Sequence, residues 1–260
     1  MAMDLQTEFP VSPMAPAIAP AKNGAGRLQL IFDVETLLLD PLQGMIDSVG
    51  WAMIERGLAP TPVDIEKAGI GRKPVSQVLS ALMETEDVQR VSEAVARFQG
   101  FFNDSGRFRC SLRKGALQML QTLARDPRIE LHYLTHAGTR TAHRILEQYG
   151  LTHLPMSVVT LEHATCPGIR LPMMKFMVEQ GARPARNWAV LSDHPWELMA
   201  AQQIGIRTLG LAYGRCELAN LCALDPDAIA AEPAEIIALL NCMLPMTSTL
   251  MGPAKPGAVH

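Results

Sequence analysis

The sequence predicts an α/β protein with a doubly wound parallel sheet and an all-helical cap inserted after the first strand. Two observations support this prediction. Short apolar runs alternate with longer amphipathic runs along most of the chain, as strands and helices do around a parallel sheet. The alternation stops between positions 40 and 110, where only helical patterns occur. A chain of 260 residues has room for one large domain, or one domain with an insertion.

Five short apolar runs are the expected strands, because each is broken at its carboxyl end by a polar residue, as buried parallel strands often are. They cover 28–32, 130–135, 157–160, 188–192 and 207–211. Amphipathic helices are expected at 114–125, 139–149, 172–180 and 196–203. Gly150, Gly181 and Gly205 closely follow three of these helices, where a helix often ends in a residue that tolerates positive φ.

The remaining segments define the predicted domain organisation. Residues 1–26 and 244–260 are expected to be flexible tails, and the core is expected to comprise 27–40 and 111–243. The cap, 41–110, shows helical patterns near 42–57, 63–68, 74–84 and 88–103. Ligands of doubly wound sheets bind at the carboxyl ends of the strands. Since the cap leaves the core at one such end, we expect it to lie over a ligand site.

The composition excludes several classes of protein. Apolar residues make up 48% and charged residues 19% of the chain, as in soluble globular proteins. The net charge of -3, without a concentrated basic patch, argues against a nucleic-acid partner, and no apolar run is long enough for a membrane span. Five cysteines without a Cys-x-x-Cys pair argue against a zinc site or disulfide framework. With no signal-like start, we expect a cytoplasmic protein.

Polar side chains lie at or shortly after the carboxyl ends of three of the predicted strands. They are Asp33 and Glu35 after the first, Thr135 and His136 after the second, and Ser192, Asp193 and Glu197 after the fourth. Carboxylates gathered at one edge of a sheet repel one another unless a cation neutralises them, and Mg²⁺ prefers such oxygen ligands. Asp33 and Asp193 can instead be residues that only cap loops or helices. His136 and His194 can contact a substrate or simply be solvated.

The order of these residues resembles a known family. Residues 32–40 read FDVETLLLD and resemble the first motif of the haloacid dehalogenase superfamily, F-D-x-D-G-T-L-x-D. LTH at 134–136 resembles the second motif, and LSDHPWE at 191–197 resembles the fourth, G-D-x-x-x-D. Residues 200–206 resemble the helix and glycine that follow this motif, and 210–214 resemble the next strand and its glycine turn. Residues 226–230 and 233–240 resemble the closing part of phosphoglycolate-phosphatase-like members. The resemblance covers about 27–241, and members of this subgroup carry a helical cap where this chain has its insertion.

The resemblance implies a Mg²⁺-dependent phosphatase of a small phosphorylated metabolite. Asp33 would attack the phosphoryl group and form an aspartyl-phosphate. Glu35 would protonate the leaving oxygen and then activate water. Thr135 would donate a hydrogen bond to the phosphoryl oxygens. Asp33, Glu35 and Asp193 would hold the metal, Glu35 through its backbone carbonyl.

The chain departs from the family pattern in its first and third motifs. Glu35 replaces an Asp and moves the carboxylate outward by roughly 1.5 Å, where a misplacement near 1 Å can cost about 100-fold in rate. Thr36 replaces a Gly and Leu37 a Thr, so we expect a loop of changed shape. Pro167 stands where the family places a phosphate-binding lysine. Cations that could replace this lysine, or that are merely solvated, are Arg170, Lys175, Arg72 and Lys73, and we assign Lys175 to the site.

These departures leave two functions open. One is the phosphatase with Asp33 as its nucleophile, and the other is a catalytically degenerate protein of the same fold that binds a ligand or a protein partner. Dehalogenation is less consistent with the sequence, because dehalogenases usually carry an aromatic residue where this chain has Glu35.

Overall fold

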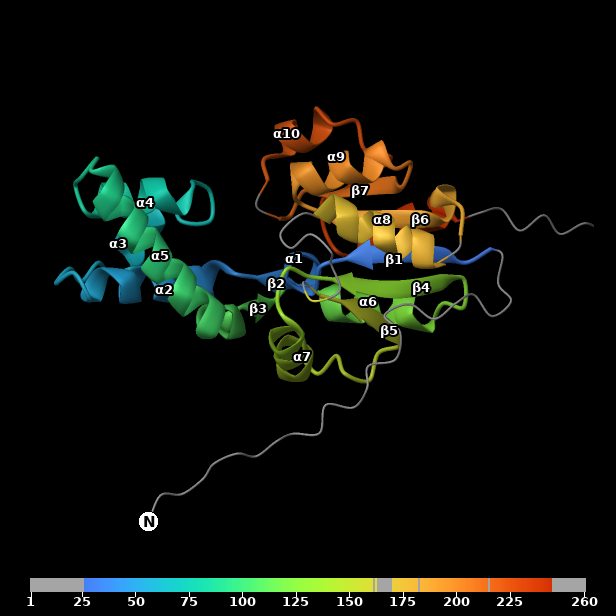
Figure 1. Ribbon diagram of the computed structural model, residues 1–260, viewed down its shortest axis with the longest axis horizontal. Helices are drawn as coiled ribbons and strands as arrows, with labels where there is room; N and C mark the ends of the chain where they lie inside the picture. The colour runs from blue at the N-terminus through green and yellow to red at the C-terminus, as the bar shows by residue number, and fades with distance from the viewer. Residues whose placement is uncertain (1–25, 161, 163–169, 182, 215, 245–260) are drawn as a thin grey trace, which may run out of the picture.

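A six-stranded parallel sheet forms the centre of the computed structural model, which describes residues 26–160, 162, 170–181, 183–214 and 216–244 (Figure 1). The strands lie in the order β5-β4-β1-β6-β7-β8, and every neighbouring pair is parallel. Their bounds are β1 Leu28–Phe32, β4 Ile129–Leu134, β5 Met156–Val159, β6 Trp188–Ser192, β7 Arg207–Leu211 and β8 Ala228–Ala230. The parallel sheet and the five expected strands are confirmed. The sixth strand, β8, has only three residues, too few to show a strand pattern in the sequence.

Helices cover both faces of the sheet, as a doubly wound fold requires (Figure 1). One face packs against α1 Val34–Leu38, α6 Ala116–Arg125, α7 Thr139–Gln148 and α11 Glu235–Met243. The other packs against α8 Arg170–Gly181, α9 Pro195–Gln203 and α10 Leu218–Cys222. Side chains of β1 alternate between these layers, since Leu30 and Phe32 belong to the first and Ile31 to the second. None of the helices in the described residues combines the length and apolar character needed to cross a membrane.

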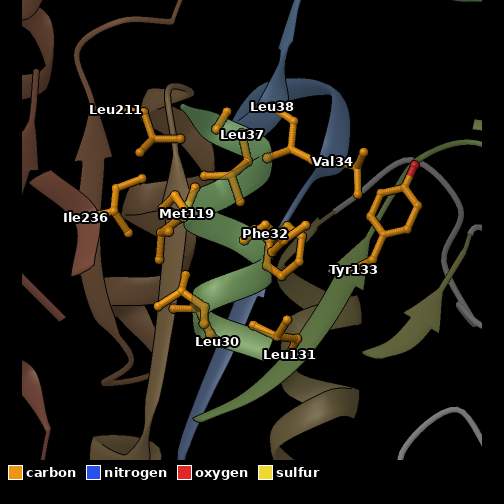
Figure 2. Packing of buried hydrophobic residues seen from close by; sticks show 14 of the residues in the cluster. Leu30, Phe32, Val34, Leu37, Leu38, Met119, Leu131, Tyr133, Leu211 and Ile236 are labelled. Carbon is orange, nitrogen blue, oxygen red and sulfur yellow. The ribbon is translucent and has the colours of Figure 1, made fainter. Parts of the chain in front are cut away.

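The segment after β1 explains one departure from the family motif. Residues 34–38 form the short helix α1, and Leu37 is fully buried in the first hydrophobic cluster. Figure 2 shows Leu37 beside Met119, in the cluster that also holds Leu211 and Ile236. A leucine therefore stands here because the position is part of the core, where a threonine would bury a hydroxyl group.

The segment between β1 and β4 holds the inserted helices, which lie at one side of the sheet (Figure 1). They are α2 Leu42–Ile54, α3 Pro62–Ala68, α4 Val75–Leu82, α5 Val88–Asp104 and the 3-10 helix η1 Gly106–Arg109. They share a hydrophobic cluster of their own, which includes Met53, Leu79 and Phe98. The chain enters and leaves through two short antiparallel strands, β2 Leu39–Asp40 and β3 Ser111–Leu112. Residues 1–25 and 245–260 of the predicted tails lie outside the described residues.

Candidate active site

The two aspartates predicted to act together lie at the carboxyl ends of neighbouring strands. β1 and β6 pair in parallel with Phe32 opposite Leu191, so Asp33 and Asp193 follow at the same edge of the sheet. Only 7% of Asp33 and 5% of Asp193 is exposed, yet both line a cavity of about 780 Å³. Its volume is in the range of small-molecule sites. The other predicted strand-end residues that line it are Glu35, Thr135, His136, His194 and Glu197.

Asp33 is held at the start of α1 by its own side chain. Its Oδ1 accepts a hydrogen bond of 2.9 Å from the backbone N–H of Glu35, which makes Asp33 the N-cap of that helix. The capping role weighed from the sequence is therefore real, but it does not exclude chemistry. The cap fixes the rotamer of a carboxylate that borders the cavity, and a fixed carboxylate is what in-line attack needs.

Asp193 is positioned by close contact with the turn after β7. A Cβ atom on Gly214 would lie 2.2 Å from Cβ of Asp193 and 2.4 Å from its Oδ2. Such distances are far inside van der Waals contact, so any side chain at position 214 would displace the aspartate. The family resemblance includes this glycine turn, but only the structure shows that its glycine makes room for Asp193.

A hydrogen-bond chain joins the end of β6 to α9. Ser192 Oγ donates to Glu197 Oε2 at 2.7 Å and accepts from the N–H of His194 at 2.9 Å. Ser192 is fully buried, so these bonds satisfy its hydroxyl group away from bulk water. Glu197 thus stabilises the loop that carries Asp193.

Thr135 directly follows β4, on the other side of Asp33 from Asp193. Its N–H donates to the carbonyl of Val159 at 3.0 Å, and its Oγ1 accepts from the N–H of Ala137 at 3.1 Å. A hydroxyl group that accepts one bond still carries a proton to donate. Tyr133 lies beneath the site: burial, and then the charges of Asp33 and Glu35, raise its pKa well above 10, so it stays protonated.

The cations of the cavity wall differ from those expected. Among the described residues, Arg107 of η1 and Arg113, just after β3, are the arginines that line it. Arg107 Nε lies 3.8 Å from Glu35 Oε1 and forms an ion pair with it. Lys175, assigned to the site from the sequence, is exposed on α8 and is not part of the wall. Its role as the phosphate-binding residue stays a prediction from the sequence.

The other cations considered from the sequence also lie away from this cavity or cannot be placed. Arg72 and Lys73 are exposed on the cap. Arg72 borders a second, smaller cavity, of about 320 Å³, which shares Arg113 and Pro41 with the first. Pro167 and the side chain of Arg170 lie outside the described residues.

The donor set suits a divalent ion that also binds a substrate. The described residues contain no group of three or more His, Cys, Asp and Glu side chains arranged to hold a metal. Mg²⁺ commonly takes only one or two protein carboxylates and completes its shell with water and phosphate oxygens. Asp33 and Asp193 fit that pattern. The Glu35 carbonyl accepts from the N–H of Leu39, which occupies one of its two lone pairs.

Two curated proteins that are similar in sequence to this chain are phosphatases. The chain is 22% identical over 218 residues to the phosphoglycolate phosphatase of Aliivibrio fischeri, a match covering 82% of this chain and 96% of that protein. It is also 22% identical over 221 residues to the phosphoglycolate phosphatase of Photobacterium profundum, covering 80% and 93%. No family model matches the chain.

Solved structures share its fold. A haloacid dehalogenase-like hydrolase from Streptococcus pneumoniae superposes with a TM-score of 0.65 at 19% identity, covering 82% of this chain and 98% of that one. A predicted phosphoglycolate phosphatase from Haemophilus somnus gives 0.63 at 17% identity, covering 82% and 98%. The family resemblance and the fold class predicted from the sequence are thereby confirmed.

Proposed function

Because the chain has the haloacid dehalogenase fold and is similar in sequence to phosphoglycolate phosphatases, we propose that it hydrolyses the phosphate ester of a small metabolite. One observation carries the proposal: two nearly buried aspartates and a buried threonine meet at the wall of one cavity. Buried like charges destabilise a fold, so they are retained where a ligand uses them. The names of the relatives make phosphoglycolate the first substrate to test, and the cytoplasm stays the predicted location.

The reaction follows from what each side chain can do. Asp33 attacks phosphorus in line and forms an acyl phosphate, while the bond from phosphorus to the ester oxygen breaks. Glu35 gives its proton to the departing oxygen. Its carboxylate then takes a proton from water, which attacks phosphorus and releases inorganic phosphate and the Asp33 carboxylate. Thr135 donates to a phosphoryl oxygen throughout.

A divalent ion would complete this site. Asp33 and Asp193 would hold it, with the Glu35 carbonyl as a further ligand. When bound, such an ion neutralises charge on the transferring phosphoryl group. The narrow fit between Asp193 and Gly214 then matters, because it fixes one of the two carboxylates before any ligand arrives.

The ion pair between Glu35 and Arg107 favours a second function. In this pair the Glu35 carboxylate faces a guanidinium group and not the leaving oxygen of an ester. A protein in which this pair persisted would bind phosphorylated ligands without turning them over. The assay that follows separates the two functions.

The test is phosphate release by the purified full chain from phosphoglycolate and p-nitrophenyl phosphate, with Mg²⁺ and with chelator. Asp33→Asn should reduce release by at least about 1,000-fold, because an amide is not a nucleophile of this kind. Asp104→Asn, an exposed position at the end of α5, is the matched control and should retain the parent rate. Equal rates in the parent and Asp33→Asn would remove Asp33 from the mechanism. Binding of the esters by the parent without any release would favour the second function.

A further inference from the structure

Arg107 carries a buried donor that lacks an acceptor. Only 14% of its side chain is exposed, and its Nε has no hydrogen-bond partner among the described residues. The 3.8 Å contact with Glu35 is an ion pair but too long for a hydrogen bond. Leaving a buried donor unpaired costs about 1–3 kcal/mol, more for a charged group. A donor kept at that cost beside a cavity indicates that its acceptor arrives with a ligand.

The backbone around Arg107 is packed too closely for η1 to shift freely against the cap. A Cβ atom on Gly44 of α2 would lie 2.1 Å from the carbonyl oxygen of Gly106. A Cβ atom on Gly106 would lie 2.5 Å from Ser48 Oγ. Two glycines therefore let α2 and η1 touch backbone to backbone. This contact sets the position of the residue that follows, Arg107.

The same turn is attached to the core through α7. The Tyr149 hydroxyl group donates to the carbonyl of Cys110 at 2.9 Å and lies 3.3 Å from the carbonyl of Arg107. Burial raises the pKa of Tyr149 to about 12, so it remains a donor at neutral pH. The Arg144 guanidinium group lies 4.2 Å from the centre of the Phe108 ring, a cation–π contact. Arg107 is thus fixed from both the cap and the core.

We propose that Arg107 binds the phosphoryl group of the substrate and is the main cation of the site. The inference rests on the proposed function and names the group that recognises its substrate. Asp33, Glu35 and Asp193 place negative charge around the cavity, so a dianionic phosphoryl group needs a cation from another element. A guanidinium group can donate two parallel hydrogen bonds to phosphate, which an ammonium cannot match. The phosphoryl oxygens replace Glu35 as its ion-pair partner, so that the carboxylate can transfer a proton.

Arg113 is the alternative candidate for binding the phosphoryl group. Within the part of the chain that the structure describes, its Nε is also buried without a hydrogen-bond partner, and it lines the same cavity. Its guanidinium group, however, lies 5.3 Å from the centre of the Tyr213 ring, a cation–π contact. Arg107 instead borders Glu35, the predicted proton donor, so its charge lies closer to the reacting atoms.

The experiment compares Arg107→Gln, Arg107→Lys, Arg113→Gln and the control Arg109→Gln in the full chain. Arg109 lies two residues on in η1, is exposed, and pairs with Asp47 on the cap. Two quantities are measured with Mg²⁺ present: the Kd for inorganic phosphate by calorimetry, and KM and kcat for p-nitrophenyl phosphate. Thermal unfolding of each variant verifies the fold.

Arg107→Gln should raise the Kd for phosphate and the KM by about 10- to 100-fold, the range expected for losing a charged hydrogen bond. Arg107→Lys should recover only part of this loss, and Arg109→Gln should bind within twofold of the parent. A larger loss in Arg113→Gln than in Arg107→Gln would overturn the assignment. So would an unchanged Kd in a folded Arg107→Gln.

Failure of this inference and failure of the proposed function give different results. If the parent binds phosphate through Arg107 but releases none from any ester, the assignment of Arg107 stands and the hydrolase is wrong. If the parent hydrolyses esters and Arg107→Gln does so with the same KM, the hydrolase stands and the role of Arg107 is wrong.

Discussion

The two ends of the parallel sheet both bury polar side chains, but they differ in what those side chains face. At the carboxyl end, Asp33, Thr135 and Asp193 border a cavity. Toward the amino end, Gln29 and His132 are buried, and Trp188 belongs to the cluster that packs against α8. Groups that border a cavity can meet a ligand. Groups enclosed by packing can only affect stability.

The enclosed cluster consists of one hydrogen bond and one stacked pair. His132 Nε2 lies 2.9 Å from Gln29 Oε1, and the His132 ring stacks on Trp188 with centroids 5.1 Å apart. Burial lowers the pKa of His132 to about 4, although the negative charge of Glu130 acts in the opposite direction. Arg183 adds to the lowering. The imidazole is therefore neutral at pH 7, and its burial lowers the stability of the folded protein when the solution is acidified.

Among changes that leave every side chain of the site in place, adding one methyl group at the carboxyl end should have the largest effect on activity. Gly214→Ala places a Cβ atom on Asp193, which must move. A displacement of this kind near the reacting atoms costs about 100-fold in rate. We expect that loss in phosphate release with Mg²⁺. Gly100→Ala on α5, where a Cβ atom meets nothing within 4 Å, is the control and should keep the parent rate. Full activity in Gly214→Ala would show that the position of Asp193 is not critical.

At the amino end, a change of pH that protonates His132 should affect folding stability and not activity. The pKa of His132 rises from about 4 in the folded protein to 6.5 when the chain unfolds, so the unfolded chain takes up more protons as the pH falls. Folding stability from this group is present above pH 6.5 and is lost as the pH falls from there towards 4. Between pH 7 and pH 5 the loss is roughly 2 kcal/mol.

His132→Gln tests this assignment. It should remove most of that pH dependence, measured as the difference in free energy of unfolding in urea between pH 7 and pH 5. The exposed residue His153 provides the control, since His153→Gln should leave the difference as it is in the parent. Phosphate release at pH 7 should not change in either variant. A fall in activity specific to His132→Gln would contradict the division between the two ends.

The sequence predicted the strand-end residues of the cavity better than its cations. Asp33, Thr135 and Asp193 could be found because an apolar run that stops at a polar residue marks the end of a buried strand. Arg107 could not be found in this way, because it follows the last inserted helix and reaches Glu35 only through the tertiary packing of η1. Leu37 departs from the family motif, and its complete burial shows that it is a core residue. The sequence feature that could have pointed to η1 is Gly106. The need for glycine at this position is apparent only from its close contact with Ser48 in the structure.

The smallest expected effect tests whether the site depends on the attachment of η1 to α7. Tyr149→Phe keeps the ring and removes the hydroxyl group that donates to the carbonyl of Cys110. A single hydrogen bond of this kind contributes about 1 kcal/mol, so Arg107 should be held less firmly and KM should rise by about fivefold. The His132 cluster should keep its pH dependence, because its hydrogen bond and its ring stacking join β1, β4 and β6 toward the amino end of the sheet. Thr122→Val, which removes an exposed hydroxyl on α6, is the control for loss of a hydrogen bond away from the site. If the KM of Tyr149→Phe equals that of Thr122→Val, the cap contacts of η1 alone hold Arg107 in place, and the core contributes carboxylates without positioning the cation.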